Sequence, residues 1–174
     1  MSRIRDFRLY ATVAIENVDR SGKNVGKAVY WKLYAIENLY RIIVHSILST
    51  VFYPEDWWEK IDSTIQKKAE RNKLDYLARP WHTSPGNHPI YFVGLTDINR
   101  IANAHSHLNL VIQLIPDIDK WVGKIEALRL PRNVVAHMNF PSVSDRKRID
   151  AFYNEFKSLF VGLQKNSPFV FSSP

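Results

Sequence analysis

The stretch Ala28–Thr50, AVYWKLYAIENLYRIIVHSILST, decides the fold class. Its apolar residues recur at alternating steps of four and three, at Val29, Leu33, Ile36, Tyr40, Ile43 and Ile47. This spacing puts them on one side of an α-helix. Glu37 precedes Arg41 by four residues, an order that favours an ion pair on a helix surface. The sequence therefore predicts a long amphipathic helix here.

A second helix is expected from Pro54 to about Asn72, since proline is tolerated in the first turn of a helix. Its buried side would be formed by Trp57, Trp58, Ile61 and Ile65. The proline-rich stretch LARPWHTSPGNHP follows and makes residues 74–90 a long loop. Long loops inside compact domains are often functional, so this loop is of interest in its own right.

Three more helices are expected in the second half of the chain. Thr96 is the predicted N-cap of the third, which ends near Ile115. Its apolar stripe comprises Ile98, Ile101, His105, Leu108, Ile112 and Ile115. The fourth helix starts near Asp117, and the fifth has its predicted N-cap at Ser144. The apolar stripe of the fifth comprises Ile149, Phe152, Phe156, Leu159 and Leu163.

The two ends of the chain are less regular. Residues 1–20 fit a helix or a strand, and a helix is favoured because the remaining elements are helical. Residues 165–174 are interpreted as a tail. Together, the patterns predict a single all-α domain over residues 1–174. Its four to five helices would form an up-and-down bundle, in which short loops make sequential helices antiparallel neighbours.

The composition fits a well-packed globule and restricts its partners. The 174 residues suit one domain, and 45% of them are hydrophobic. The formal charge of +7 favours a polyanionic partner, either nucleic acid or an acidic protein. The absence of cysteine excludes disulfides and thiolate metal sites. No secretory signal or membrane span is recognisable, so we expect a cytoplasmic protein without membrane contact.

Arg132 interrupts the apolar stripe of the fourth helix. That stripe runs through Ile118, Trp121, Ile125 and Leu128, and its continuation is Arg132 and then Val135. A buried, unpaired guanidinium costs several kcal/mol, so a carboxylate, a set of carbonyl groups or an external anion must compensate. Glu37 and Glu126 are the candidate carboxylates for a purely structural pair. Pro131 adds an alternative, because a kink at this residue would re-aim Arg132.

His137 lies five residues after Arg132 and is the candidate for proton transfer. Asn133 precedes His137 by four residues, so its amide could orient the imidazole. His105 is interpreted as a packing residue, and it is not expected to share a metal ion with His107 unless the helix breaks there, because residues two apart on a helix diverge. His82 and His88 lie in the proline-rich loop and are weaker candidates for a site. No cofactor or metal is expected.

Several segments together resemble the HEPN domains, and in particular their stand-alone prokaryotic members. The signature is R-x4-H, here RNVVAH from Arg132 to His137, with a polar residue directly after the arginine. The stretch AIENLYRIIVHSIL, the following WW pair and the lead YFVGLTDINRI are similar to the corresponding parts of many HEPN proteins. The resemblance covers roughly residues 28–139, and each motif alone is short.

The resemblance implies a helical bundle that forms a homodimer, with two R-x4-H motifs facing each other in one cleft. It implies a metal-independent endoribonuclease in a toxin–antitoxin or phage-defence system, or a catalytically inactive relative that binds RNA, nucleotide or a partner protein. Arg132, His137 and Asn133 would be the catalytic residues, with Glu37 and Asn139 as candidate supporting residues. A solvated pair with Arg41 explains Glu37 equally well.

Asn139 marks a departure from one branch of the family. Some HEPN toxins carry a tyrosine two residues after the histidine, and their antitoxin modifies it. That mode of control is therefore not expected here, although an antitoxin or another regulatory protein stays a candidate partner.

Overall fold

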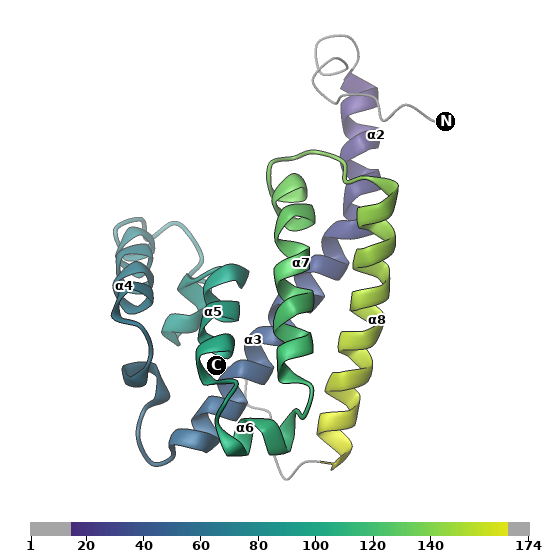
Figure 1. Ribbon diagram of the computed structural model, residues 1–174. Helices are drawn as coiled ribbons and strands as arrows, with labels where there is room; N and C mark the ends of the chain where they lie inside the picture. Colours follow the sequence, from purple (N-terminus) through teal and green to yellow (C-terminus); the bar gives the residue numbers. More distant parts are fainter. Residues whose placement is uncertain (1–14, 167–174) are drawn as a thin grey trace.

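The computed structural model describes residues 15–166, and every regular element within this range is helical (Figure 1). The elements are α2 (Ile15–Val25), a π-helical turn η1 (Gly26–Tyr30), α3 (Trp31–Phe52), a short 3₁₀ helix η2 (Trp57–Lys60), α4 (Ser63–Leu77), a second 3₁₀ helix η3 (Pro89–Phe92), α5 (Leu95–His105), α6 (Asn109–Leu114), α7 (Ile118–Ala136) and α8 (Val143–Asn166). The predicted all-α class is confirmed.

The first predicted helix is longer than expected. Helical structure continues from α2 through η1 into α3, so it spans Ile15 to Phe52. All six residues of the predicted stripe are buried, and none is more than 7% exposed. The helical preference for the N-terminal region holds for residues 15–20, whereas residues 1–14 lie outside the described part of the chain.

Helix α3 runs parallel to α8. Trp31 and Tyr40 on α3 make edge-to-face ring contacts with Tyr153 and Phe156 on α8, at centroid distances of 4.9 and 5.9 Å. Residue numbers rise together along both helices, which fixes the common direction. These two helices bury one wall of the core against each other.

Helix α7 runs the opposite way and completes the bundle with α5. Trp121 packs edge-on against Phe156 at 4.7 Å, and Lys124 pairs with Glu155, so residue numbers rise on α7 as they fall on α8. α7 also packs against α5, and α5 packs against α3. The core therefore lies within a ring of α3, α5, α7 and α8 (Figure 1).

Helix α4 stands beside this ring as an arm, attached mainly through η3. Two ion pairs, Lys68–Asp97 and Arg100–Asp62, orient it antiparallel to α5. Along the chain, α3, α4, α5, α7 and α8 thus alternate in direction, as an up-and-down arrangement requires.

The predicted second helix from Pro54 to Asn72 is wrong in its boundaries. The chain makes η2 first, and α4 begins only at Ser63, because the Asp62 carboxylate accepts the Thr64 N–H at 2.8 Å and caps a new helix. All four predicted apolar residues are nevertheless buried. α4 also extends to Leu77, so the irregular loop comprises residues 78–88 rather than 74–90.

The predicted third helix, from Thr96 to Ile115, is divided in two. α5 starts at Leu95 after Gly94, so Thr96 is not its N-cap. The helix ends at His105, and the Ser106 hydroxyl donates to the Asn103 carbonyl beyond that end. A side chain that competes for such a carbonyl favours a turn over continued helix. Ile112, expected in the core, is 43% exposed on α6.

The last two helices follow the prediction more closely. α7 begins directly after Asp117 and continues through Pro131 without interruption. α8 begins at Val143, but the residue that caps it is Ser142, not Ser144. The Ser142 hydroxyl accepts the N–H of Asp145 at 3.0 Å and donates to its carboxylate at 2.8 Å.

Candidate functional site

The C-terminal half of α7 carries the R-x4-H sequence, and Pro131 rather than Arg132 occupies its inward face. Leu128, Pro131 and Val135 are buried, whereas Arg132 is only partly covered. Steps of three and four both continue a helical stripe, and the apolar proline takes the inner position. The expectation of a buried Arg132 is therefore wrong, because its guanidinium lies at the margin of the apolar face.

Arg132 faces the carboxylate of Glu37 on α3. The distance from Arg132 Nε to Glu37 Oε2 is 3.8 Å, and the arginine side chain is 39% exposed. The contact brings together two of the predicted site residues. A pair of this length and exposure is weakly held, so the guanidinium can engage another anion.

Arg41, on the same face of α3, is the buried cation of this region. Its side chain is 8% exposed and binds the Glu37 carboxylate at 3.1 Å and the Asn38 amide oxygen at 2.8 Å. It also donates to the carbonyl oxygens of Ile90 and Val93 at 3.3 and 3.5 Å. The interpretation of Glu37 and Arg41 as a solvated pair is therefore wrong, because the η3 segment binds the Arg41 guanidinium and both side chains are largely covered.

His137 stands at the C-terminal end of α7, where the helix stops in a Schellman motif. The N–H of Asn139 donates to the Val134 carbonyl at 2.9 Å, and the N–H of Met138 to the Val135 carbonyl at 3.0 Å. Met138 takes a left-handed conformation, with φ of 59°. This position favours glycine, so a methionine here is strained. The strain directly follows the candidate histidine.

The imidazole of His137 is exposed and has no hydrogen-bond partner among residues 15–166. Asn133 does not orient it, because only the Asn133 backbone carbonyl contacts His137, at its N–H. The Asn139 side chain donates to the His137 carbonyl at 3.3 Å and leaves the ring untouched. No described residue therefore keeps either ring nitrogen from a ligand or a second chain.

The five predicted residues do not enclose one cavity within a single chain. Arg132 and Asn133 line a crevice between α5 and α7 of only about 10 Å³, and His137 is not part of it. His137 lies about 7.5 Å further along the axis than Arg132, at 1.5 Å per residue. What a single chain presents is an open surface at the end of α7.

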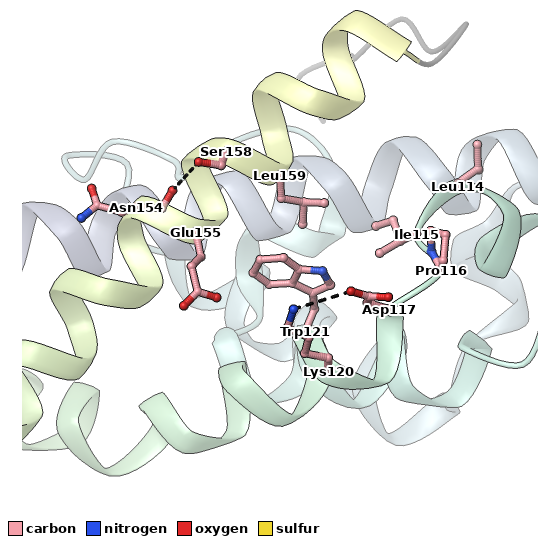
Figure 2. Close-up of a pocket in the computed structure, with 10 residues that line it drawn as sticks. All are labelled: Leu114, Ile115, Pro116, Asp117, Lys120, Trp121, Asn154, Glu155, Ser158 and Leu159. Atoms are coloured by element: carbon pink, nitrogen blue, oxygen red, sulfur yellow. Dashed lines mark hydrogen bonds and ion pairs between the residues drawn. The ribbon is translucent and has the colours of Figure 1, made fainter.

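A larger groove of about 570 Å³ lies at the opposite end of α7. Figure 2 shows the indole of Trp121 at its centre, with Asp117 directly before α7, Lys120 on α7 and Leu159 on α8 around it. The full lining comprises Leu114, Ile115, Pro116, Asp117, Lys120, Trp121, Asn154, Glu155, Ser158 and Leu159. None of the predicted site residues lines this groove.

Two further histidines form a compact cluster that the sequence patterns did not reveal. His45 on α3 and His88 in the loop before η3 lie 4.6 Å apart between ring centroids, and His88 stacks on Trp57 at 5.3 Å. His45 Nδ1 accepts the indole N–H of Trp57 at 3.3 Å, and His88 Nδ1 accepts the N–H of Ile90 at 3.2 Å. Each ring thus uses one nitrogen as an acceptor, which requires it to be neutral.

Burial of this cluster also controls its titration. Burial, followed by the neighbouring His45, lowers the pKa of His88 to about 4. Burial likewise lowers the pKa of His45, partly opposed by Asp56. The aromatic pair WW and the loop histidine were the only sequence signals of this cluster. They did not reveal it, because its members come from three separate segments.

The other histidines match their interpretations only in part. His105 packs edge-on against Phe52 at 5.6 Å and bonds the Ile101 carbonyl through Nδ1 at 2.8 Å, as expected for a packing residue. His82 is exposed beside Trp81 and belongs to no cluster of the described residues. Within residues 15–166, no three His, Cys, Asp or Glu side chains are grouped so that they could hold a metal ion.

Comparison of the chain with models of known protein families, with curated proteins and with solved structures gives no match. The resemblance to HEPN domains therefore depends on the short motifs quoted above. Among the described residues, none of the helices has the length and apolar character needed to cross a membrane.

Proposed function

We propose that the chain is a metal-independent endoribonuclease of the HEPN type whose catalytic residues are Arg132 and His137. The proposal is carried by two groups near the end of one helix: an accessible imidazole to which no described residue bonds, and a weakly held guanidinium. A proton-transfer group and a phosphate-binding group at neighbouring positions are what RNA cleavage needs.

The proposed reaction uses the 2′-hydroxyl of RNA as the nucleophile. One histidine takes the proton of this hydroxyl while its oxygen forms a bond to phosphorus. The bond from phosphorus to the 5′-oxygen then breaks, and a second histidine gives a proton to that oxygen. The guanidinium of Arg132 stabilises the charge that develops on the non-bridging oxygens. The products are a 2′,3′-cyclic phosphate and a 5′-hydroxyl end.

A homodimer would supply the two histidines. One chain contributes a single His137 at an exposed end of the bundle, so base and acid would come from two copies. In this proposal Glu37 positions Arg132 through the pair described above. Asn133 directly follows Arg132, and Asn139 lies two residues after His137. The same proposal includes Asn133 as a catalytic residue and Asn139 as a supporting residue. The proposed setting is cytoplasmic toxin or phage-defence activity, restrained by an antitoxin or another regulatory protein.

A cleavage assay with purified protein tests the proposal. RNA labelled at one end is incubated in EDTA with the wild-type chain, His137→Ala and Arg132→Ala. His107→Ala serves as the matched control, because His107 is also exposed. We expect a rate loss of at least about 100-fold for His137→Ala and none for the control. A single 2′-deoxy substitution at the cut site should block cleavage. Full activity of either site variant would refute the assigned roles.

The alternative is a catalytically inactive HEPN-like bundle that binds RNA, a nucleotide or a partner protein. The existing pair of Arg132 with Glu37 and the absence of a bond from the Asn133 amide to His137 favour this reading. Under this alternative, the wild-type chain leaves RNA intact but still binds its ligand. RNA binding that weakens with rising salt and is unaffected by His137→Ala would support it.

A further inference from the structure

Two tyrosines on neighbouring turns are exposed close to the candidate site. Tyr30, the last residue of η1, is 59% exposed, and Tyr34, in the first turn of α3, is 64% exposed. Residues four apart on a helix have Cβ atoms about 5–6 Å from each other, so the two rings can lie side by side. At 100° per residue, both fall within roughly 60° of Glu37 around the helix axis. They therefore share the face that contacts Arg132.

These rings differ from the neighbouring Trp31, which has structural partners. Trp31 packs against Tyr153, and its indole N–H donates to the Lys27 carbonyl at 2.9 Å. The side chains of Tyr30 and Tyr34 have no ring contact or hydrogen bond within residues 15–166. Among the described residues nothing gives these two side chains a structural role, which leaves them available for a ligand.

The helix directions place the tyrosines beside the R-x4-H end of α7. α7 runs antiparallel to α8, and α8 runs parallel to α3, so α7 and α3 are antiparallel. Glu37 and Arg132 mark the same level. From this level Tyr30 lies about 10 Å along the axis, in the direction in which His137 lies about 7.5 Å away. Along the helix axes, the tyrosines thus lie on the same side of the Glu37–Arg132 pair as His137.

The surroundings of this surface favour a polyanion. Lys23 and Lys27 precede Tyr30, and Lys147 and Arg148 lie in the first turns of α8 at the same end of the bundle (Figure 1). All four side chains are exposed, and none forms an ion pair with another described residue. Exposed aromatic rings among unpaired cations are typical of surfaces that bind single-stranded nucleic acid.

We infer that Tyr30 and Tyr34 form a platform on which bases of single-stranded RNA stack, beside the phosphate held by Arg132. This inference rests on the proposed function, because it takes RNA as the ligand. Stacking tolerates every base, so the platform predicts a preference for unpaired RNA rather than for a particular sequence.

A binding experiment with the full chain tests the platform separately from catalysis. The probe is a fluorescent, single-stranded 2′-O-methyl oligonucleotide, which the proposed reaction cannot cleave. Its comparison partner is an abasic oligomer of the same length and charge. The variants are Tyr30→Leu/Tyr34→Leu and Tyr30→Phe/Tyr34→Phe. Trp81→Leu is the control, since Trp81 is 76% exposed in the irregular loop that follows α4.

We expect the double leucine variant to bind the oligonucleotide about 10- to 100-fold more weakly than the wild-type chain. The double phenylalanine variant and the control should bind within about twofold of it, because an aromatic ring is retained or untouched. The abasic oligomer should bind weakly and equally to all of them. Far-ultraviolet circular dichroism verifies that each variant is folded.

Unchanged oligonucleotide binding by the double leucine variant would overturn the platform. A changed oligomeric state with unchanged binding would also overturn it and assign the surface to protein contacts. The two proposals fail separately. RNA cleavage that does not depend on the tyrosines refutes the platform alone, whereas tyrosine-dependent binding without cleavage refutes the endoribonuclease alone.

Discussion

Arg41 and Arg132 contact the same carboxylate, that of Glu37, but the regions around them differ. In the closed centre, defined by Arg41, His45 and His88, every charged or ring group has several partners. In the open end, defined by Arg132, His137 and Met138, the guanidinium has one distant partner and the imidazole has none among the described residues. Arginine and histidine therefore stabilise the fold in the closed centre, whereas in the open end they are accessible to a ligand.

The largest expected effect is the loss of Arg41. Arg41→Met should lower the free energy of unfolding by about 3–5 kcal/mol, because the Ile90 and Val93 carbonyls lose their donor and Glu37 keeps only the more distant Arg132. Arg132→Met should cost less than about 1 kcal/mol, since its pair is half-exposed. Urea unfolding of both variants measures the contrast. Similar losses would erase the distinction between the two regions.

Acid should weaken the closed centre. The pKa of His88 is about 4 in the folded chain and near 6.5 when unfolded, so the unfolded chain binds more protons between these values. The contribution of neutral His88 to the free energy of unfolding is therefore fully present above pH 6.5 and is lost as the pH drops towards 4. The loss is about 2 kcal/mol, less than the full shift implies because the ring is partly wetted.

Thermal unfolding from pH 7 to pH 4 checks this dependence. Carboxylates titrate in the same range, so the informative quantity is the difference between variants. His88→Gln should flatten the profile between pH 6.5 and 4, because it removes the group whose pKa burial lowers. A wild-type slope in His88→Gln would show that the cluster does not set the acid response.

A smaller effect is expected from Met138→Gly, which should stabilise the open end. Met138→Gly should raise the free energy of unfolding by about 1 kcal/mol, because glycine takes a φ of 59° without strain. Met138→Ala retains the strain and should give no gain. The melting temperatures of the two variants provide the measurement, and equal values would contradict the assignment of strain to this residue.

The smallest expected effect is the coupling energy between Glu37 and Arg132, which is best compared with the coupling between Glu37 and Arg41. A double-mutant cycle of Glu37→Gln with Arg132→Gln should give a coupling of a few tenths of a kcal/mol, as for other exposed pairs. The cycle of Glu37→Gln with Arg41→Gln should give more than about 1 kcal/mol, because that pair is buried at 3.1 Å. The reverse order would mean that Arg132 is the structural partner.

Apolar periodicity predicted the parts of the fold that the core determines. The stripes of α3 and α7 were recovered because burial fixes their spacing, and only Arg132 broke the second one. The errors fall at helix ends, where single side chains decide. Asp62 and Ser142 cap helices at residues that the periodicity did not indicate, and Ser106 lies where α5 stops early.

The candidate site could be predicted only where its residues are close in sequence. The spacing of Arg132 and His137 is local, whereas their exposure depends on which side of α7 faces the core. The burial of Arg41 was missed because its carbonyl partners follow it by 49 and 52 residues. Contacts over that sequence distance depend on which segments the fold brings together, and the apolar pattern of a single helix does not indicate this.

The parallel packing of α3 on α8 has a consequence for biosynthesis. The cross-contact between Lys32 and Asp150 joins residues 118 positions apart, so the part of α3 that packs on α8 stays uncovered on the ribosome until α8 emerges. Assembly of this bundle must wait for its last helix rather than proceed along the nascent chain. A chain that ends before Val143 is therefore expected to aggregate instead of folding.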